Sequence, residues 1–244
     1  GAIKNIYTQS LSANINPTSE RNSLDGISVG DLVVETYQTK SIAKVAAINY
    51  EGNYYLTGGD EGNGGDWYSR KYVKKLLNKL NNFSTNELVS ETFKTRSLAT
   101  IQYISEDGSY YLTGGDEGSG GDWYNISYIK KLVNEKDGIK VEDNIVEKYG
   151  TRSISSVKYI SEDGLYYLTG GDEGSRGDWY STKYLTKLVP SLNGYSVGES
   201  VIETFQTESE VKIQYITDDG NYYLTGGDEG SGGDWYSTKY MRKK

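Results

Sequence analysis

Short stretches of the chain alternate between apolar and polar residues with a period of two. In the clearest stretch, Val211, Ile213 and Tyr215 are separated by Lys212 and Gln214. Because successive side chains of a strand point to opposite faces of a sheet, this alternation predicts a strand with one buried face. The corresponding positions earlier in the chain are Ala99, Ile101 and Tyr103.

Apolar runs and turn residues predict further strands around this one. A strand rich in apolar and β-branched residues is expected before it, at 31–37, 87–93, 143–149 and 199–205. Hairpin turns are expected after it, at 51–52, 107–108, 163–164 and 219–220, where an acidic residue precedes Gly. A third strand is predicted at Tyr-Tyr-Leu-Thr. A glycine-rich loop then leads to Trp-Tyr, a single helical turn at 69–72 and a closing strand at 72–76. The pattern predicts an all-β chain.

These elements belong to a repeat without gaps. The block Tyr54–Tyr68 recurs from Tyr110, Tyr166 and Tyr222, each time 56 residues further on, and only its tenth and eleventh positions vary. The repeats are predicted at 23–78, 79–134, 135–190 and 191–244, and residues 1–22 are expected to form a linker or an adaptor strand. Four or five short strands in each copy are typical of a small barrel or sandwich. A four-bladed β-propeller is the alternative, although its blades are usually shorter than 56 residues.

Composition excludes several kinds of chemistry. The chain has no Cys and no His, so it has neither disulfides, nor thiolate metal sites, nor a Ser-His or Cys-His pair. Its net charge of -8 disfavours nucleic acid as a partner. No run of about 18 apolar residues is present, so no membrane insertion is expected. Since a catalytic pair normally occurs once, four identical loops indicate binding rather than an enzyme, and no cofactor is expected.

The order of the predicted elements resembles bacterial Src-homology-3-like domains. Gly30-Asp31, Asp219-Gly220 and Trp67-Tyr68-Ser69 are among the residues that carry the resemblance, which extends over 23–244. It implies four tandem small β-barrels that bind peptidoglycan or wall polysaccharide, as behind the catalytic domains of Gram-positive wall hydrolases and phage endolysins. It also implies a secreted, extracellular or cell-surface protein, monomeric, with a catalytic domain upstream of Gly1. The glycine-rich loop at 58–66 departs from the family pattern.

The acidic loop and the aromatic pair after it are the candidate ligand site, because polar loop residues are identical in all four copies while linker residues vary. The candidate residues are Asp60, Glu61, Asp66, Trp67 and Tyr68; Asp116, Glu117, Asp122, Trp123 and Tyr124; Asp172, Glu173, Asp178, Trp179 and Tyr180; and Asp228, Glu229, Asp234, Trp235 and Tyr236. Trp would stack on a sugar ring while the carboxylates accept hydroxyl hydrogen bonds.

Two other interpretations of this block stay open. The carboxylates could instead form turns while Trp packs in the core. They could also bind Ca²⁺, although the spacing lacks the usual calcium-loop pattern and no metal site is predicted. Of Tyr54 and Tyr55, one is expected in the core and the other outside. The sequence therefore predicts a non-catalytic, multivalent module for bacterial wall carbohydrate or peptidoglycan. The alternative is a structural or adhesive repeat protein that binds a host protein or a glycan.

Overall fold

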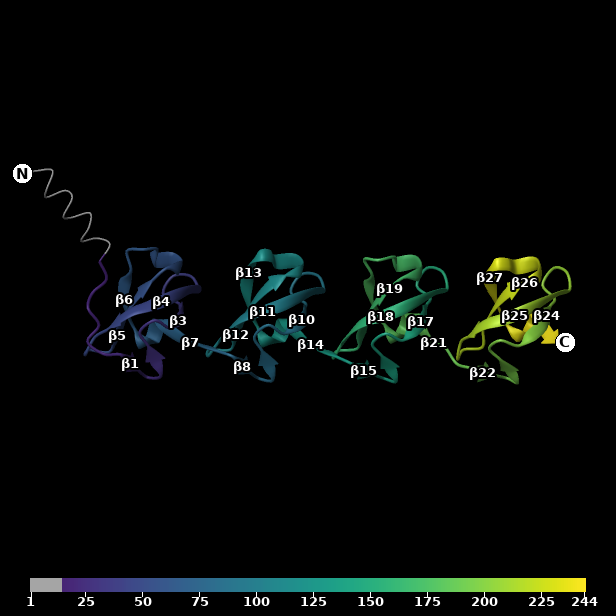
Figure 1. Cartoon of the computed structure of the whole chain (residues 1–244), viewed down its shortest axis with the longest axis horizontal. Coiled ribbons are helices and arrows are strands. Elements are labelled where there is room, and N and C mark those ends of the chain that lie inside the picture. The colour runs from purple at the N-terminus through teal and green to yellow at the C-terminus, as the bar shows by residue number, and fades with distance from the viewer. Residues whose placement is uncertain (1–14) are drawn as a thin grey trace, which may run out of the picture. The chain divides into compact units, whose positions relative to one another are not determined.

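The computed structural model describes residues 15–244, which form β-strands and single turns of 3-10 helix without any α-helix. The chain divides into two compact units, the first ending at Lys130 and the second beginning at Lys131. Each unit contains two similarly built modules (Figure 1). The all-β prediction is confirmed. Of the predicted segment 1–22, residues 1–14 lie outside the described residues.

Seven strands and two helical turns make up the first module. They are β1 (Ser23–Leu24), β2 (Ile27–Ser28), β3 (Leu32–Glu35), β4 (Ser41–Ile48), β5 (Asn53–Thr57), η1 (Gly59–Glu61), β6 (Asp66–Ser69), η2 (Arg70–Tyr72) and β7 (Val73–Leu77). The long strands form an antiparallel sheet in the order β7-β3-β4-β5-β6, and β1 and β2 form a small hairpin. Strands β4, β5 and β7, the hairpin turn and η2 lie where the sequence predicted them. The strand predicted at 31–37 is shorter, since β3 ends at Glu35, and the small hairpin of β1 and β2 was not predicted.

The other three modules repeat this order. The second has β8 (Lys79–Leu80), β9 (Phe83–Ser84), β10 (Leu88–Glu91), β11 (Ser97–Ser105), β12 (Ser109–Gly114), η3 (Gly115–Glu117), β13 (Gly118–Asn125), η4 (Ile126–Tyr128) and β14 (Ile129–Val133). The third has β15 (Glu135–Lys136), β16 (Ile139–Lys140), β17 (Asn144–Glu147), β18 (Ser153–Ser161), β19 (Leu165–Thr169), η5 (Gly171–Glu173), β20 (Asp178–Ser181), η6 (Thr182–Tyr184) and β21 (Leu185–Lys187). The fourth has β22 (Ser191–Leu192), β23 (Tyr195–Ser196), β24 (Ser200–Glu203), β25 (Ser209–Ile216), β26 (Tyr222–Gly226), η7 (Gly227–Glu229), β27 (Gly230–Tyr236), η8 (Thr238–Tyr240) and β28 (Met241–Lys243).

Each module has its own hydrophobic core. In the fourth module the core is built from Val201, Val211, Ile213, Ile216, Tyr222, Leu224 and Met241. The first Tyr of each Tyr-Tyr pair is fully buried, and its hydroxyl donates to a carbonyl of the small hairpin, as from Tyr222 to Leu192 O at 3.0 Å. The second Tyr lies on the other face, as the alternation requires. Separate cores favour small independent modules over propeller blades, which pack face to face with their neighbours.

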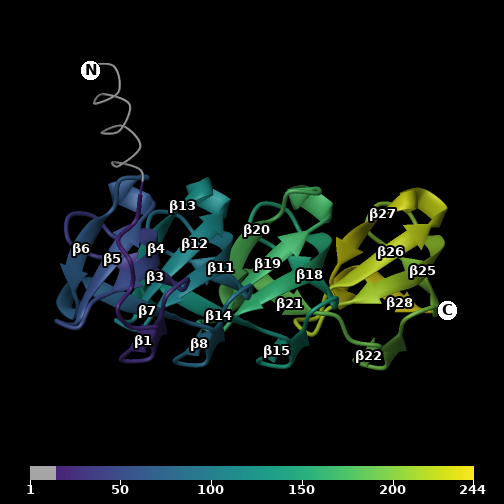
Figure 2. The same ribbon diagram turned by 60° about the vertical axis from the view of Figure 1, so that its left-hand side comes forward.

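The sheets are open, and this corrects the expectation of closed barrels. Strand order in the fourth module is β27-β26-β25-β24-β28, and among the described residues its edge strands β27 and β28 do not pair. The small hairpin covers the core instead, because Leu192 and Tyr195 pack against it. The side chains of the two-stranded hairpin thus cover the core that strand closure would cover in a barrel. Figure 2 shows these hairpins, labelled β1, β8, β15 and β22, each beside the larger sheet of its own module.

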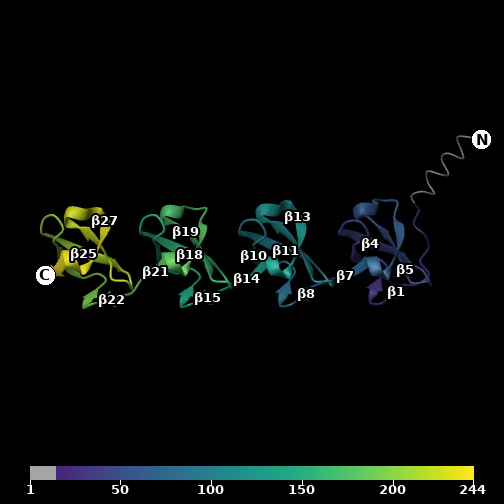
Figure 3. The same cartoon turned by 180° about the vertical axis from the view of Figure 1, so that it is seen from behind.

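The last strand of one module also pairs with the next module. In β7, residues Val73, Lys74 and Lys75 pair with β3 of the first module. Leu76 and Leu77 then pair with Ser105 and Ile104 of the second. Figure 3 shows β7 running between these two modules. In the second unit, Leu188 forms a bridge with Thr217 of the fourth module, so the same sharing recurs.

Candidate functional site

A hydrogen bond joins the acidic loop to a second loop of its own module. Asp60 Oδ2 accepts a hydrogen bond from the hydroxyl of Thr39, which lies between β3 and β4. The same pair recurs as Thr95 with Asp116, Thr151 with Asp172 and Thr207 with Asp228. The first carboxylate of the block therefore has a structural partner in every module, although its side chain is exposed.

Glu61 and Tyr68 form a second hydrogen bond that all four modules share. The Tyr68 hydroxyl donates to Glu61 Oε1, and each other module has the same bond. Burial raises the pKa of Glu61, and the negative charges of Glu35, Asp66 and Asp60 raise it further. Burial and the hydrogen bond to Glu117 likewise raise the pKa of Tyr124. Each tyrosine hydroxyl is thus bonded to a glutamate, and that glutamate feels the negative charge of further carboxylates.

The structure separates Trp from these carboxylates. On β6, Tyr68 packs in the core and Asp66 lies on the same side of the strand, whereas Trp67 points to the opposite face. Asp66 is exposed, and its Oδ1 accepts a hydrogen bond at 2.8 Å from the N–H of Trp67, the next residue. Asp122, Asp178 and Asp234 accept from Trp123, Trp179 and Trp235 in the same way. The five predicted site residues of each copy therefore belong to two faces.

The Trp side of the sheet carries a row of rings. The Tyr111 ring lies between those of Tyr103 and Trp123, with centroids 5.8 and 5.1 Å apart, tilted against the first and edge-on to the second. The third and fourth modules have the same Tyr-Tyr-Trp row, and the first has Tyr55 beside Trp67 at 5.3 Å, with Ala47 in the third place. All four Trp are half-buried and belong to none of the four cores. The interpretation of Trp as a core residue is therefore wrong.

Sequence reasoning missed one motif of the carboxylate side. Each copy contains Glu, any residue, an aromatic residue, any residue and Thr, as in 35–39, 91–95, 147–151 and 203–207. Glu35 is 1% exposed and accepts the N–H of Tyr37 at 2.6 Å. Burial raises the pKa of Glu35, although that hydrogen bond acts in the opposite direction. The motif was visible in the sequence, because these three positions agree in all four copies.

The aromatic residue of this motif is exposed in every module. Tyr37 is 56% exposed, and Phe93, Tyr149 and Phe205 are 49%, 66% and 50% exposed. The ring of Tyr37 is held edge-on by Tyr72, at 5.1 Å between centroids, and lies 5.8 Å from Tyr68. We call the group Tyr37, Asp60, Glu61, Asp66, Tyr68 and Tyr72, with its equivalents in the other modules, the acidic aromatic site.

The fold explains why one glycine of the block is the same in all four copies while its neighbour varies. Gly65 has φ +66°, and a Cβ there would lie 2.5 Å from the Tyr55 ring. At Gly64 a Cβ would meet nothing within 4 Å, and Arg176 occupies this place in the third copy. The fold therefore requires glycine at one of these two neighbours and not at the other.

Gly65→Ala is accordingly expected to destabilise the first module by about 1–2 kcal/mol from the left-handed backbone alone, with added cost from the Tyr55 ring. Gly64→Ala is the matched control, and it should change the free energy of unfolding by less than about 0.5 kcal/mol. Urea denaturation followed by tryptophan fluorescence measures both. Equal effects of the two substitutions would contradict the assignment.

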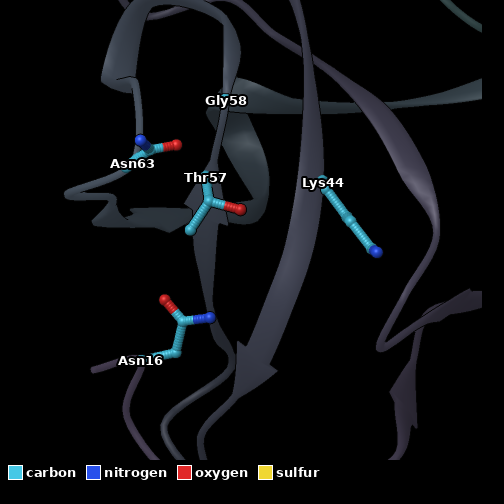
Figure 4. Close-up of a pocket in the computed structure, with 5 residues that line it drawn as sticks. All are labelled: Asn16, Lys44, Thr57, Gly58 and Asn63. Carbon is cyan, nitrogen blue, oxygen red and sulfur yellow. The ribbon is translucent and has the colours of Figure 1, made fainter. Parts of the chain in front are cut away.

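A hollow of about 600 Å³ lies on the Trp side of the first module. It is lined by Asn16, Lys44, Thr57, Gly58 and Asn63 (Figure 4). The lining is polar and contains no carboxylate. Within residues 15–244, no group of three or more acidic side chains is arranged to hold a metal ion. The same residues include no helix long and apolar enough to cross a membrane.

Comparison with known proteins adds little to this geometry. The sequence matches no known family model and no curated protein. Among solved structures, the chain is similar to the four MBT repeats of Drosophila melanogaster Sfmbt, crystallised with the peptide RHR(me)K VLR. That likeness has 8% identity and a TM-score of 0.20, and it covers 89% of this chain and 88% of the other. At such a TM-score it supports no conclusion on the fold or the ligand, so the function must be argued from the site.

Proposed function

We propose that this protein is a non-catalytic, multivalent binding module in which each repeat holds bacterial wall carbohydrate or peptidoglycan at its acidic aromatic site. The modules are small, open relatives of bacterial Src-homology-3-like domains, acting at the cell surface or outside the cell. An upstream catalytic domain, delivered to the wall by the four modules, belongs to the same proposal.

One observation carries this proposal: an aromatic ring is kept half-exposed at the same place in all four modules. The Tyr37 ring packs against Tyr72 and Tyr68, yet more than half of the side chain stays open to solvent, where a ligand can stack on it. Its chain neighbour varies freely, as Gln38, Lys94, Gly150 and Gln206. A half-exposed ring beside exposed carboxylates suits a sugar, whose apolar face stacks on the ring while its hydroxyl groups donate to Asp60 and Asp66.

The test is binding of the full chain to purified Gram-positive walls. Replacement of Tyr37, Phe93, Tyr149 and Phe205 by Ala should remove about 1 kcal/mol of stacking at each site. Because linked sites act together, the apparent affinity should fall by about 100-fold or more. The control carries Gln38→Ala, Lys94→Ala and Gln206→Ala on the same loops and should bind like the wild type. A folded four-fold aromatic variant that still binds with wild-type affinity would refute the site.

A spacer or adhesive protein is the second candidate, favoured by the strand that neighbouring modules share. Hydrogen bonding of β7 to both the first and the second module stiffens their connection, as a spacer requires. Removing the fourth module from the C-terminal end distinguishes the two functions. Avidity predicts a steep loss of wall binding, whereas a pure spacer has no wall binding to lose.

A further inference from the structure

Neighbouring modules of the first unit meet at a cluster of a cation, a carboxylate and an indole. Lys40, from the loop between β3 and β4, pairs with Asp107 of the second module's hairpin. Its ammonium also donates to Ser109 Oγ at 3.0 Å and lies 5.6 Å from the ring centroid of Trp123. Although burial acts in the opposite direction, the hydrogen bond and charge of Lys40 hold the pKa of Asp107 below its usual value.

The second unit contains the same cluster between the third and fourth modules. Arg152 replaces Lys40, pairs with Asp219 at 3.4 Å and lies 5.8 Å from the ring centroid of Trp235. The indole N–H of Trp235 donates to the carbonyl of Arg152 at 3.2 Å. Trp, which the block repeats four times, is therefore a residue of the contact with the preceding module in both units.

The first and last modules depart from this pattern at one position each. The cation position holds Lys40, Arg96, Arg152 and then Glu208, and the hairpin position holds Glu51, Asp107, Asp163 and Asp219. Glu208 pairs within its own module, with Arg242 at 3.1 Å. The loop of the last module thus presents a carboxylate where the other three present a cation.

We propose that this cluster is a pairing code between modules. A module accepts a preceding module only if that module brings Lys or Arg to its Trp and its hairpin carboxylate. Glu208 does not satisfy this rule, because a Trp and a hairpin carboxylate placed beside it would meet a negative charge in place of a cation.

Nuclear magnetic resonance of the full chain tests the pairing code through the Trp123 indole. Lys40→Glu should shift the indole resonance and accelerate hydrogen exchange at Ser109, by about tenfold if like charges drive the modules apart. The double variant with Asp107→Lys should restore the indole resonance toward wild type. Exchange at Ser109 is compared in the single variant alone, because its N–H donates to Asp107 Oδ1 at 3.2 Å. Lys44→Glu is the matched control, since it makes the same charge change on an exposed residue of the same module. An unchanged Trp123 in the Lys40→Glu protein, or no rescue by the double variant, would overturn the code. Wall binding is not involved in this measurement, so the inference can fail while the proposed function stands.

Discussion

Tyr110→Ala is expected to destabilise the second module by about 3–5 kcal/mol, enough to unfold a module of this size in the intact chain. The Tyr110 side chain is fully buried, its ring lies 5.7 Å from that of Phe83, and its hydroxyl donates to Leu80 O at 3.1 Å. Ala leaves a ring-sized cavity between sheet and hairpin and deprives the Leu80 carbonyl of its donor. Hydrogen exchange should show protection lost across 79–128.

Two substitutions separate the causes of this loss. Tyr110→Phe keeps the ring and removes only the hydroxyl, so it should cost about 1 kcal/mol. Tyr111→Ala changes the neighbouring, half-buried Tyr on the other face, and it should leave the second module folded. If Tyr111→Ala were as damaging as Tyr110→Ala, the assignment of the two faces would be wrong.

The second large effect is expected on the stability of an isolated module, which depends on the residue at which the fragment begins. A fragment that begins at Lys79, where the sequence repeat begins, should be about 3 kcal/mol less stable than one that begins at Lys71, both ending at Asn134. The shorter fragment lacks Leu77, which packs against the core of the second module and pairs with Ile104. It also lacks Lys75, whose N–H and carbonyl both bond to Glu106, at 2.9 Å each.

Urea denaturation of the two fragments measures this difference, and Leu77→Ala in the longer fragment is the control. That substitution should remove a part of the advantage, because it deletes the packing and keeps the backbone pairing. Fragments of equal stability would show that the shared strand contributes nothing to the module that follows it.

Local patterns predicted the strands and could not predict the closure of the sheet. Alternation at 211–215 and the acidic-Gly hairpins depend on neighbouring residues, and both appear in the structure as β25 and its turn. Whether two edge strands meet depends on packing across the whole module. For that reason a closed barrel was expected from the sequence, whereas in the structure Leu192 and Tyr195 of the small hairpin cover the core.

The site was predicted in part for a similar reason. Identity between copies identified Asp60, Glu61, Asp66, Trp67 and Tyr68, and the structure places the first two on η1 and the other three on β6. Strand alternation, applied to Asp66, Trp67 and Tyr68, could already have divided them between two faces. The partners Thr39 and Tyr37 lie more than twenty residues before the acidic loop, where no local rule links them to it.

The strand that neighbouring modules share within a unit bears on how such an array changes in length. Because the repeat has no gaps, exchange of genetic material between misaligned copies adds or removes 56 residues. The order of the strands within each module is then preserved. Wherever the crossover falls, a shared strand still carries one half for its own sheet and one half for the next. Copies can therefore be gained or lost without any new joining segment.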